Sequence, residues 1–209
     1  IQWSNNLKYK IEEFDSVGFK GDFFFRPSHI DENLEPYTLK ILVIDPSGRG
    51  TDETAYAVLG VMSQKIFIID FGGLSGGYDI EVLNKLSRKA KDYNVNTVYI
   101  ESNFGDGMFT QLLKPVLLKY HHCGIEEISN YKQKEKRIID TLEPLMNQHK
   151  LVIDYSATKA DLNTHYKSTG EEGKHEYSLF YQLTRITDEK GSLRHDDRLD
   201  AIAMGCEAL

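Results

Sequence analysis

The sequence predicts an α/β fold in which a mixed central sheet is flanked by helices. Two features of the chain support this prediction. First, three apolar runs at 39–45, 54–62 and 65–71 follow one another through short linkers rich in Gly, Ser and Asp, a pattern typical of an antiparallel three-strand meander. Second, helical and strand periodicities alternate from about residue 80 onward, which favours further strands that pair in parallel.

Periodicity identifies each element of the second half. Apolar residues recur at helical spacing from Ile80 to Ala90 and predict a helix that ends near Tyr93. The elements expected after it, in chain order, are a strand at 97–101, a helix at 107–120, a strand at 125–128, a helix at 134–149, a strand at 151–154 and a helix starting near 195. The polar stretch 167–176 predicts a loop.

The chain divides into two predicted regions. Residues 1–37 lack a clear period and are expected to form a connector with a short strand or hairpin. Residues 38–209 have the length and patterning of one domain. Because the first residue is Ile1 rather than Met, we expect the connector to lead from an upstream region.

Composition limits the class of protein. No apolar run approaches the roughly 20 residues that cross a bilayer, so no membrane partner is expected. Cys123 and Cys206 show neither zinc-site nor disulfide spacing, which is consistent with a reducing cytosol. The net charge of −7, from 25 basic and 32 acidic residues, argues against a protein that coats nucleic acid nonspecifically. It is compatible with a nuclease that gathers acidic groups around metal ions.

Carboxylates end two of the predicted strands. Asp45 closes one apolar run and Glu101 closes another, which places both at the sheet edge where α/β proteins usually carry their chemistry. Either group alone is most simply a strand-end carboxylate facing solvent. If both meet the acidic cluster at 196–200, charges about 4 Å apart repel by roughly 4 kcal/mol at an effective dielectric of about 20, so bound cations are needed. Two Mg²⁺ or Mn²⁺ ions suit such oxygen donors and can activate water for phosphodiester hydrolysis.

The third acidic group is the cluster at 195–200. On a helix, Asp197 and Asp200 lie three residues apart and Asp196 and Asp200 lie four apart, so two carboxylates share one face near the helix start. The simpler alternative is that Asp196 and Asp197 only oppose the helix dipole, an effect of about 0.3–1 kcal/mol. His195 is a candidate Mn²⁺ ligand, a proton shuttle or a helix-start residue.

Basic residues close to these elements are candidate DNA contacts. Lys and Arg side chains position a duplex through its phosphates without reading its sequence. The candidates are Lys132, Lys134, Lys136, Arg137, Arg185, Arg194 and Arg198. The alternatives are a solvated helical face for the group at 132–137 and a surface ion pair for Arg198.

Three segments resemble one known family. They are Asp45-Pro-Ser-Gly-Arg-Gly-Thr-Asp-Glu-Thr-Ala-Tyr-Ala-Val, Glu101-Ser-Asn-Phe-Gly-Asp-Gly and His195-Asp-Asp-Arg-Leu-Asp-Ala-Ile-Ala. They are similar to segments of the nuclease domain of phage terminase large subunits, above all the short-tailed phage type, and the resemblance extends over residues 39–209.

This resemblance implies an RNase H-like fold and metal-dependent cleavage of concatemeric double-stranded viral DNA, during genome packaging in the host cell cytoplasm. It implies that Asp45, Glu101 and Asp197 are catalytic, with Asp45 bridging two ions. It leaves Asp196 or Asp200 as an auxiliary metal ligand. It also implies an upstream ATPase domain, a portal and a small terminase subunit as partners. The chain itself contains no Gly-x-x-x-x-Gly-Lys-Ser/Thr loop.

Other interpretations stay open at this point. A junction resolvase or exonuclease of the same superfamily would use similar carboxylates, and a non-catalytic docking module of a packaging motor would carry them for solubility alone. Asp70-Phe71-Gly72 matches the metal-binding tripeptide of protein kinases by chance, because the companion motifs are missing. Gly72-Gly73 is expected to form a turn, and Gly48-Arg49-Gly50 a tight loop.

Overall fold

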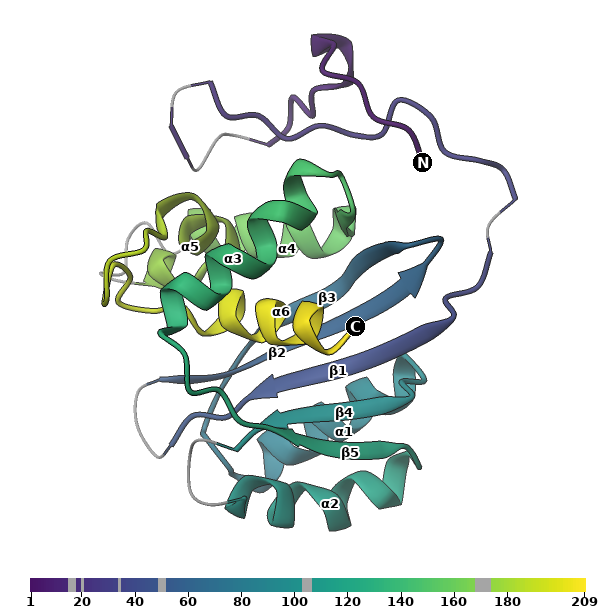
Figure 1. Ribbon diagram of the computed structural model, residues 1–209. Coiled ribbons are helices and arrows are strands. Elements are labelled where there is room, and N and C mark those ends of the chain that lie inside the picture. Colours follow the sequence, from purple (N-terminus) through teal and green to yellow (C-terminus); the bar gives the residue numbers. More distant parts are fainter. Residues whose placement is uncertain (15–17, 20, 34, 49–51, 103–106, 168–173) are drawn as a thin grey trace.

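The structure is a computed structural model that describes residues 1–14, 18–19, 21–33, 35–48, 52–102, 107–167 and 174–209. It contains a six-stranded sheet of order β5-β4-β1-β2-β3-β6 (Figure 1). The strands are β1 (Leu39–Asp45), β2 (Glu53–Met62), β3 (Lys65–Ser75), β4 (Thr97–Glu101), β5 (Gly124–Ile128) and β6 (Leu151–Ile153). The helices are η1 (Leu7–Tyr9), α1 (Ile80–Asp92), α2 (Met108–Tyr120), α3 (Lys134–Asn147), α4 (Tyr155–Lys167), η3 (Lys174–Tyr177), α5 (Leu179–Arg185) and α6 (Asp197–Ala208).

The predicted mixed sheet is confirmed. β1, β2 and β3 pair antiparallel and form the expected meander. β4 pairs in parallel with β1, β5 pairs in parallel with β4, and β6 pairs in parallel with β3. The carboxyl ends of β1, β4 and β5 therefore lie at one edge of the sheet.

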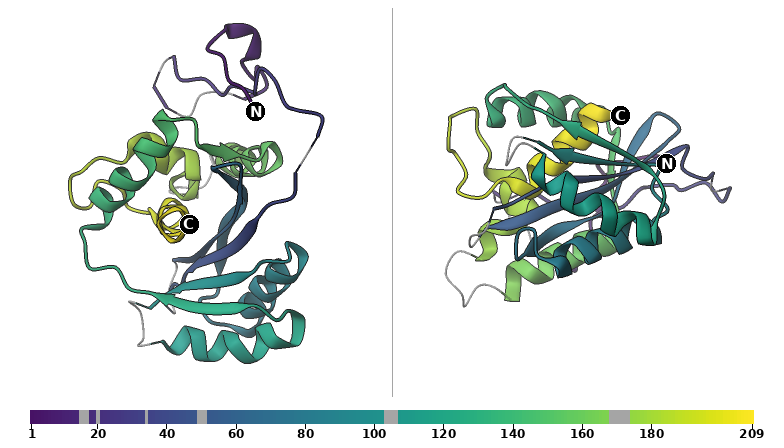
Figure 2. Two further views of the ribbon diagram at one scale, coloured as in Figure 1. Left: turned by 45° about the vertical axis from the view of Figure 1, so that its right-hand side comes forward. Right: turned by 90° about the horizontal axis from the view of Figure 1, so that it is seen from below.

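Helices cover both faces of the sheet (Figure 1, Figure 2). α1 and α2 pack on one face, and α3, α4, α5 and α6 lie on the other. Side chains of β1 alternate between the two cores, with Leu42 and Ile44 facing α1 and α2, and Ile41 and Val43 facing α6. This alternation sets the face on which the last residue of β1 lies.

The last helix lies close against the middle of the sheet, and a glycine in it allows this approach. Ala201, Ala203 and Gly205 of α6 are buried. A Cβ atom at Gly205 would lie 2.2 Å from Leu59 Cδ1 and 2.9 Å from Val43 Cγ2. The glycine therefore lets α6 approach β1 and β2, and the N-terminus of α6 is brought to the carboxyl end of β1.

β3 is longer than predicted. Gly72 and Gly73 continue the strand and pair with Tyr56 and Ala55, so the prediction of a turn was wrong. A Cβ atom at Gly73 would lie 1.8 Å from the carboxyl carbon of Glu53. The glycine thus leaves room for an acidic side chain that reaches across from β2.

Two helices, α4 and α5, were not predicted. α4 carries few apolar residues, and its start is specified by Asp154, whose Oδ1 accepts hydrogen bonds from the Ser156 and Ala157 amides. α5 is short, and Ser178 caps it by accepting a hydrogen bond from the Tyr181 amide. The capping residues were therefore the available sequence signal, since neither segment has a long apolar stripe.

The first 37 residues pack on the body through aromatic side chains. Antiparallel bridges join Gln2 to His29 and Lys10 to Phe25, in line with the short hairpin that was expected. Phe14 is buried and stacks on Tyr155 of α4 at 5.1 Å between ring centroids. A division of the chain at residue 38 remains a prediction.

Three predictions concern residues that lie outside the described ranges. These residues are 49–50 of the Gly48-Arg49-Gly50 loop, 168–173 of the expected loop at 167–176, and 103–106 of the segment that follows Glu101. Among the helices of the described ranges, none is both long and apolar enough to cross a membrane.

Replacing Gly205 with Ala is expected to destabilise the protein by about 1–3 kcal/mol, because the new methyl group overlaps Leu59 and Val43 in a close-packed core. Equilibrium unfolding in urea measures the change. Gly124→Ala at the start of β5 is the matched control, since its nearest neighbour would be Thr97 Oγ1 at 3.1 Å. Equal stability of the two variants would contradict the close approach of α6.

Candidate metal centre

The pairing register of β1 and β4, together with the alternation of their side chains between the two faces of the sheet, places Asp45 and Glu101 side by side. β1 and β4 are parallel neighbours with Ile44 beside Ile100, so Asp45 and Glu101 are the next residues of the two strands. Asp45 follows Val43 on the face covered by α6. Both carboxylates therefore end their strands at the same edge of the sheet and on the same side of it.

The start of α6 adds the remaining predicted carboxylates. Asp196 precedes the helix, and Asp197 and Asp200 lie in its first turn. Burial raises the pKa of Asp45 well above its usual value; Lys134 opposes this, and the charges of Asp200, Glu101 and Asp197 add to it. The structure thus brings the predicted acidic residues together, whereas their role as metal ligands remains a prediction.

Lys134 projects its ammonium group into this acidic cluster. Its Nζ lies 2.7 Å from Asp196 Oδ1, 3.1 Å from Asp200 Oδ2, 3.5 Å from Asp197 Oδ1 and 3.8 Å from Asp45 Oδ2. The four carboxylates raise the pKa of Lys134 far above its ordinary value, although burial acts against this as the largest single effect. Lys134 was expected to contact DNA phosphate, but it faces the carboxylates instead.

Several carboxylate oxygens in the cluster lack a hydrogen-bond donor. They are Asp45 Oδ2, Asp197 Oδ2 and Asp200 Oδ2, which are buried and have no partner with hydrogen-bond geometry, although the Lys134 ammonium lies 3.1 Å from Asp200 Oδ2 and 3.8 Å from Asp45 Oδ2. A buried anionic oxygen without a donor is costly unless a cation binds it. Hard oxygen donors in this number are the ligands that Mg²⁺ and Mn²⁺ prefer, so the residues fit the expected ions.

Asp200 is held by a second cation. Arg137 of α3, with a side chain only 3% exposed, forms a short ion pair with Asp200 through Nη2 and a 3.3 Å ion pair with Glu207 through Nη1. The Arg137 side chain is thus buried between two acids of α6, and its predicted contact with DNA remains a prediction. Arg137 and Asp200 are 63 residues apart in the sequence, so no local pattern indicates this pairing.

Arg198 anchors α6 from the other side. Its Nε and Nη2 donate to Glu53 at 2.6 Å and 2.9 Å, and its Nη1 donates to Asp161 at 3.1 Å. Asp161 also accepts hydrogen bonds from Ser178 Oγ and the Leu179 amide, at the start of α5. The side chain of Arg198 is 10% exposed, and its predicted contact with DNA remains a prediction. Arg198 instead fixes the helix turn that carries Asp197.

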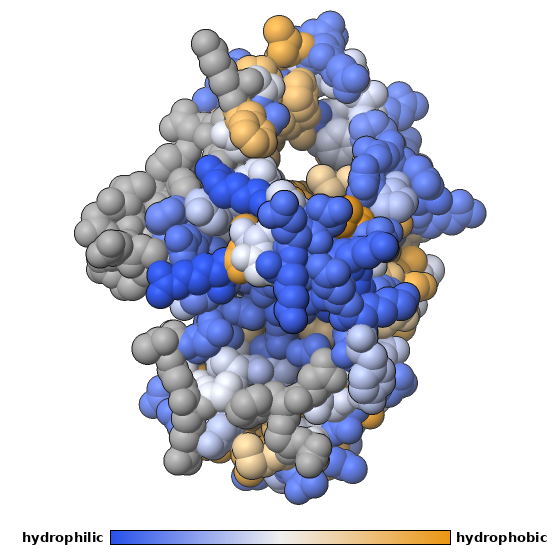
Figure 3. All heavy atoms as spheres, turned by 60° about the vertical axis from the view of Figure 1, so that its left-hand side comes forward, coloured by the Kyte–Doolittle hydropathy of each residue, from blue (hydrophilic) through white to orange (hydrophobic). Residues whose placement is uncertain are grey.

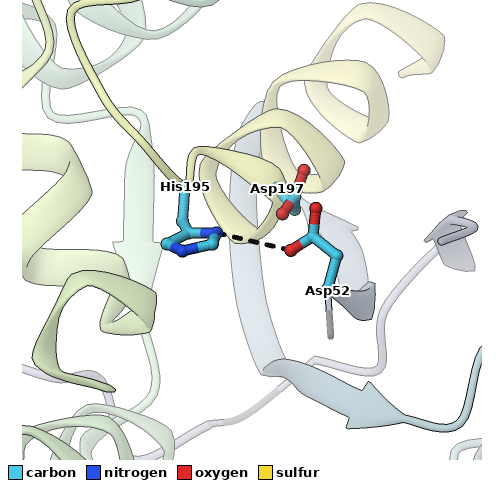
Figure 4. A group of neighbouring side chains, drawn as sticks. All are labelled: Asp52, His195 and Asp197. Atoms are coloured by element: carbon cyan, nitrogen blue, oxygen red, sulfur yellow. Dashed lines mark ion pairs between the residues drawn. The ribbon is translucent and has the colours of Figure 1, made fainter. Parts of the chain in front are cut away.

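Asp52 and His195 lie beside Asp197 of the cluster (Figure 4). His195 Nδ1 lies 3.3 Å from Asp52 Oδ1, and the imidazole stacks on Tyr177 at 3.9 Å between ring centroids. One possible ligand atom each of Asp52, His195 and Asp197 lies within 4.8 Å of the others, close enough to share an ion. Asp52 was not predicted, although it lies inside the motif that begins at Asp45.

The remaining basic candidates lie on the surface. Lys132, Lys136, Arg185 and Arg194 are exposed. Lys132 borders the same hollow as Lys134. Figure 3 looks toward the edge where β1 and β4 end, and it shows hydrophilic residues across the middle of this face. Contact between these four residues and DNA remains a prediction.

Comparison with known families places the chain. The family model described as Terminase Bacteriophage T7, Ribonuclease H-like domain matches residues 44–151. The chain belongs to this terminase RNase H-like family. The terminase large subunit of Enterobacteria phage T3 is 47% identical over 210 residues, which cover 100% of this chain but only 35% of that relative. The predicted resemblance to phage terminase large subunits is confirmed.

Solved structures share the fold of this terminase domain. A human cytomegalovirus terminase nuclease domain, Mn soaked and inhibitor bound, aligns with a TM-score of 0.55 at 11% identity and covers 82% of each chain. The nuclease domain of gp2 from bacterial virus Sf6 aligns with a TM-score of 0.53 at 12% identity, covering 82% of this chain and 89% of its own. The large terminase of a thermophilic bacteriophage aligns with a TM-score of 0.56 at 14% identity, covering 86% of this chain and 42% of its own. At such identities the likeness establishes the fold, and the RNase H-like prediction is confirmed.

Replacing Asp197 with Asn is expected to stabilise the terminase domain in metal-free buffer at alkaline pH. Burial raises the pKa of Asp197 from 3.8 to about 7 in the folded protein. Ionisation of this carboxyl therefore costs stability in full above pH 7, and the cost shrinks as the pH falls through the range between the two pKa values, because the folded protein is protonated there first. We expect a gain on the order of 2 kcal/mol at about pH 8, because Asn also loses the attraction of Lys134. Urea unfolding in EDTA across this pH range measures it.

The control is Asp92→Asn at the exposed end of α1, which should change the free energy of unfolding little at any pH. A loss of stability in Asp197→Asn at alkaline pH would contradict the electrostatic strain described for the cluster.

Replacing Arg198 with Met is expected to destabilise the protein by about 3–5 kcal/mol, because Glu53 and Asp161 are left buried without their cation. Arg194→Met is the matched control, since Arg194 has a side chain that is 75% exposed. Thermal and urea unfolding measure both variants. If Arg198→Met were as stable as Arg194→Met, Arg198 would be a surface residue after all.

Proposed function

We propose that the chain is the nuclease of a DNA-packaging terminase and hydrolyses phosphodiester bonds of double-stranded DNA with two Mg²⁺ or Mn²⁺ ions. The observation that supports this most is the convergence of Asp45, Glu101 and Asp197 from three separate elements. Bound ions of this kind supply an activated water and stabilise the leaving oxygen of the phosphodiester. Related nuclease domains have been solved after soaking in manganese or together with it.

Each acidic residue takes a distinct part in this proposal. Asp45, Glu101 and Asp197 hold the ions, and Asp196 or Asp200 is an auxiliary ligand. Arg137 orients Asp200 through their buried ion pair, so the guanidinium is a positioning group. His195, aligned by Asp52 and Tyr177, lies beside Asp197 as an auxiliary ligand or proton carrier.

The substrate in this proposal is concatemeric viral DNA in the host cell cytoplasm. Exposed Lys132, Lys136, Arg185 and Arg194 supply positive charge for phosphates without base recognition. Because the chain spans 35% of its T3 relative, the upstream ATPase domain, the portal and the small terminase subunit are proposed partners of the larger protein.

Replacing Asp45 with Asn is expected to reduce Mn²⁺-dependent cleavage of plasmid DNA by more than about 100-fold. Mutation of residues that only support metal ligands already lowers metal affinity or activity about 10–100-fold. Asp45 is proposed as a direct ligand, so a larger loss is expected. Linearisation of supercoiled plasmid, followed on agarose gels, measures the rate. The folded state should persist by circular dichroism, because the buried carboxylate of Asp45 opposes folding rather than supporting it.

Asp92→Asn makes the same chemical change on the surface and should cleave at the rate of the unsubstituted protein. Substrate choice separates the related functions: preferential cutting of four-way junctions would favour a resolvase, and cutting only from free ends would favour an exonuclease. Retained cleavage in Asp45→Asn would refute the assignment of the site. Absence of saturable Mn²⁺ uptake by the unsubstituted protein would favour a docking module.

A further inference from the structure

The ammonium of Lys134 lies where the proposed ligands converge. It forms ion pairs with Asp45, Asp196, Asp197 and Asp200, at N–O distances between 2.7 and 3.8 Å. Two of these partners, Asp45 and Asp197, are proposed to hold the ions. One side chain from α3 thus links the end of β1 to the start of α6, through the carboxylates that the ions need.

This ammonium neutralises the cluster only in part. Lys134 brings one positive charge and three N–H donors to four carboxylates, and Arg137 adds a second charge only at Asp200. Asp45 Oδ2 and Asp197 Oδ2 keep no hydrogen-bond donor, and Asp200 Oδ2, on a side chain only 1% exposed, has the Lys134 ammonium at 3.1 Å without hydrogen-bond geometry. The cluster therefore retains capacity for more positive charge than Lys134 provides.

Lys134 and divalent ions compete for the same oxygens. Mg²⁺ binds oxygen at about 2.0–2.1 Å and accepts little distortion of its octahedral shell. An ammonium 3.5 Å from Asp197 Oδ1 and 3.8 Å from Asp45 Oδ2 is close enough to these oxygens to obstruct an ion that they would ligate. Like charges at this separation repel, so the ammonium and the ions exclude one another.

The position of Lys134 allows its side chain to leave. It is the first residue of α3, and its side chain is 36% exposed, on a flexible four-carbon stem. Arg137, one turn further along the same helix, is 3% exposed and is held by acids at both ends of its guanidinium. The cluster therefore contains one movable cation and one fixed cation.

We propose that Lys134 is an internal counter-cation that holds the metal-free cluster together and swings out to solvent when divalent ions bind. The proposal rests on the metal site of the proposed function. It explains how four carboxylates pack together during folding without metal. Because the ions must displace Lys134, part of their binding free energy is used for this displacement. The apparent metal affinity is therefore weaker than the carboxylates alone would give.

Lysine labelling of the unsubstituted protein tests the displacement directly. Reductive methylation is followed by mass spectrometry, first in EDTA and then in saturating Mg²⁺. Lys134 should be protected in EDTA and should react several-fold faster in Mg²⁺, whereas exposed Lys136 should react at one rate in both buffers. Continued protection of Lys134 in Mg²⁺, in a protein that takes up the ion by calorimetry, would overturn the inference and leave the metal site intact.

Metal affinity provides an independent measurement. Lys134→Met should bind Mn²⁺ about tenfold more tightly than the unsubstituted protein, since no ammonium has to be displaced. It should also melt at a lower temperature in EDTA and regain the difference in Mn²⁺. Lys136→Met, on the same helix, should bind Mn²⁺ with unchanged affinity. Weaker Mn²⁺ binding by Lys134→Met would overturn the proposal, and failure of all three proteins to bind Mn²⁺ would overturn the metal site together with it.

Discussion

Mutual repulsion among buried carboxylates is the constraint to which the rest of this structure responds. Asp45, Asp197 and Asp200 are brought from a strand end and a helix start into one cluster, and burial raises the pKa of Asp45 and of Asp197. Such a cluster opposes folding. It persists because the sheet and its two helical layers hold the backbone that carries it, a trade of stability for a binding site that is common in functional centres.

The cations around the cluster fall into two kinds. Arg137 and Arg198 are buried and each bridges two acids, which ties α6 to α3, β2 and α4. They act as structural charges, because removing either would leave buried anions unpaired. Lys134 is partly exposed and touches the acids that face the site. Asp200 therefore belongs both to the scaffold, through Arg137, and to the site, through Lys134. The basic residues are separate: the two arginines pair within the scaffold, and Lys134 pairs within the site.

The arrangement of the site also requires that backbone elements approach one another closely. Gly205 lets α6 pack on Leu59 and Val43, and Gly73 leaves space for Glu53 to meet Arg198. The family match over residues 44–151 contains Asp45, Glu101 and Lys134 but ends before α6. The T3 relative, aligned over the whole chain, includes the last helix as well.

The sequence by itself determined the elements whose residues are neighbours along the chain. It predicted the mixed sheet, the strand ends at Asp45 and Glu101, and the acidic start of the last helix, because apolar periodicity is a local property. Only the tertiary structure decided which charges meet. Arg198 and Glu53 are 145 residues apart and Arg137 and Asp200 are 63 apart, so their pairing leaves no local pattern. Basic side chains that read as DNA contacts in the sequence became counter-charges, because an ion pair depends on distance in space and on burial.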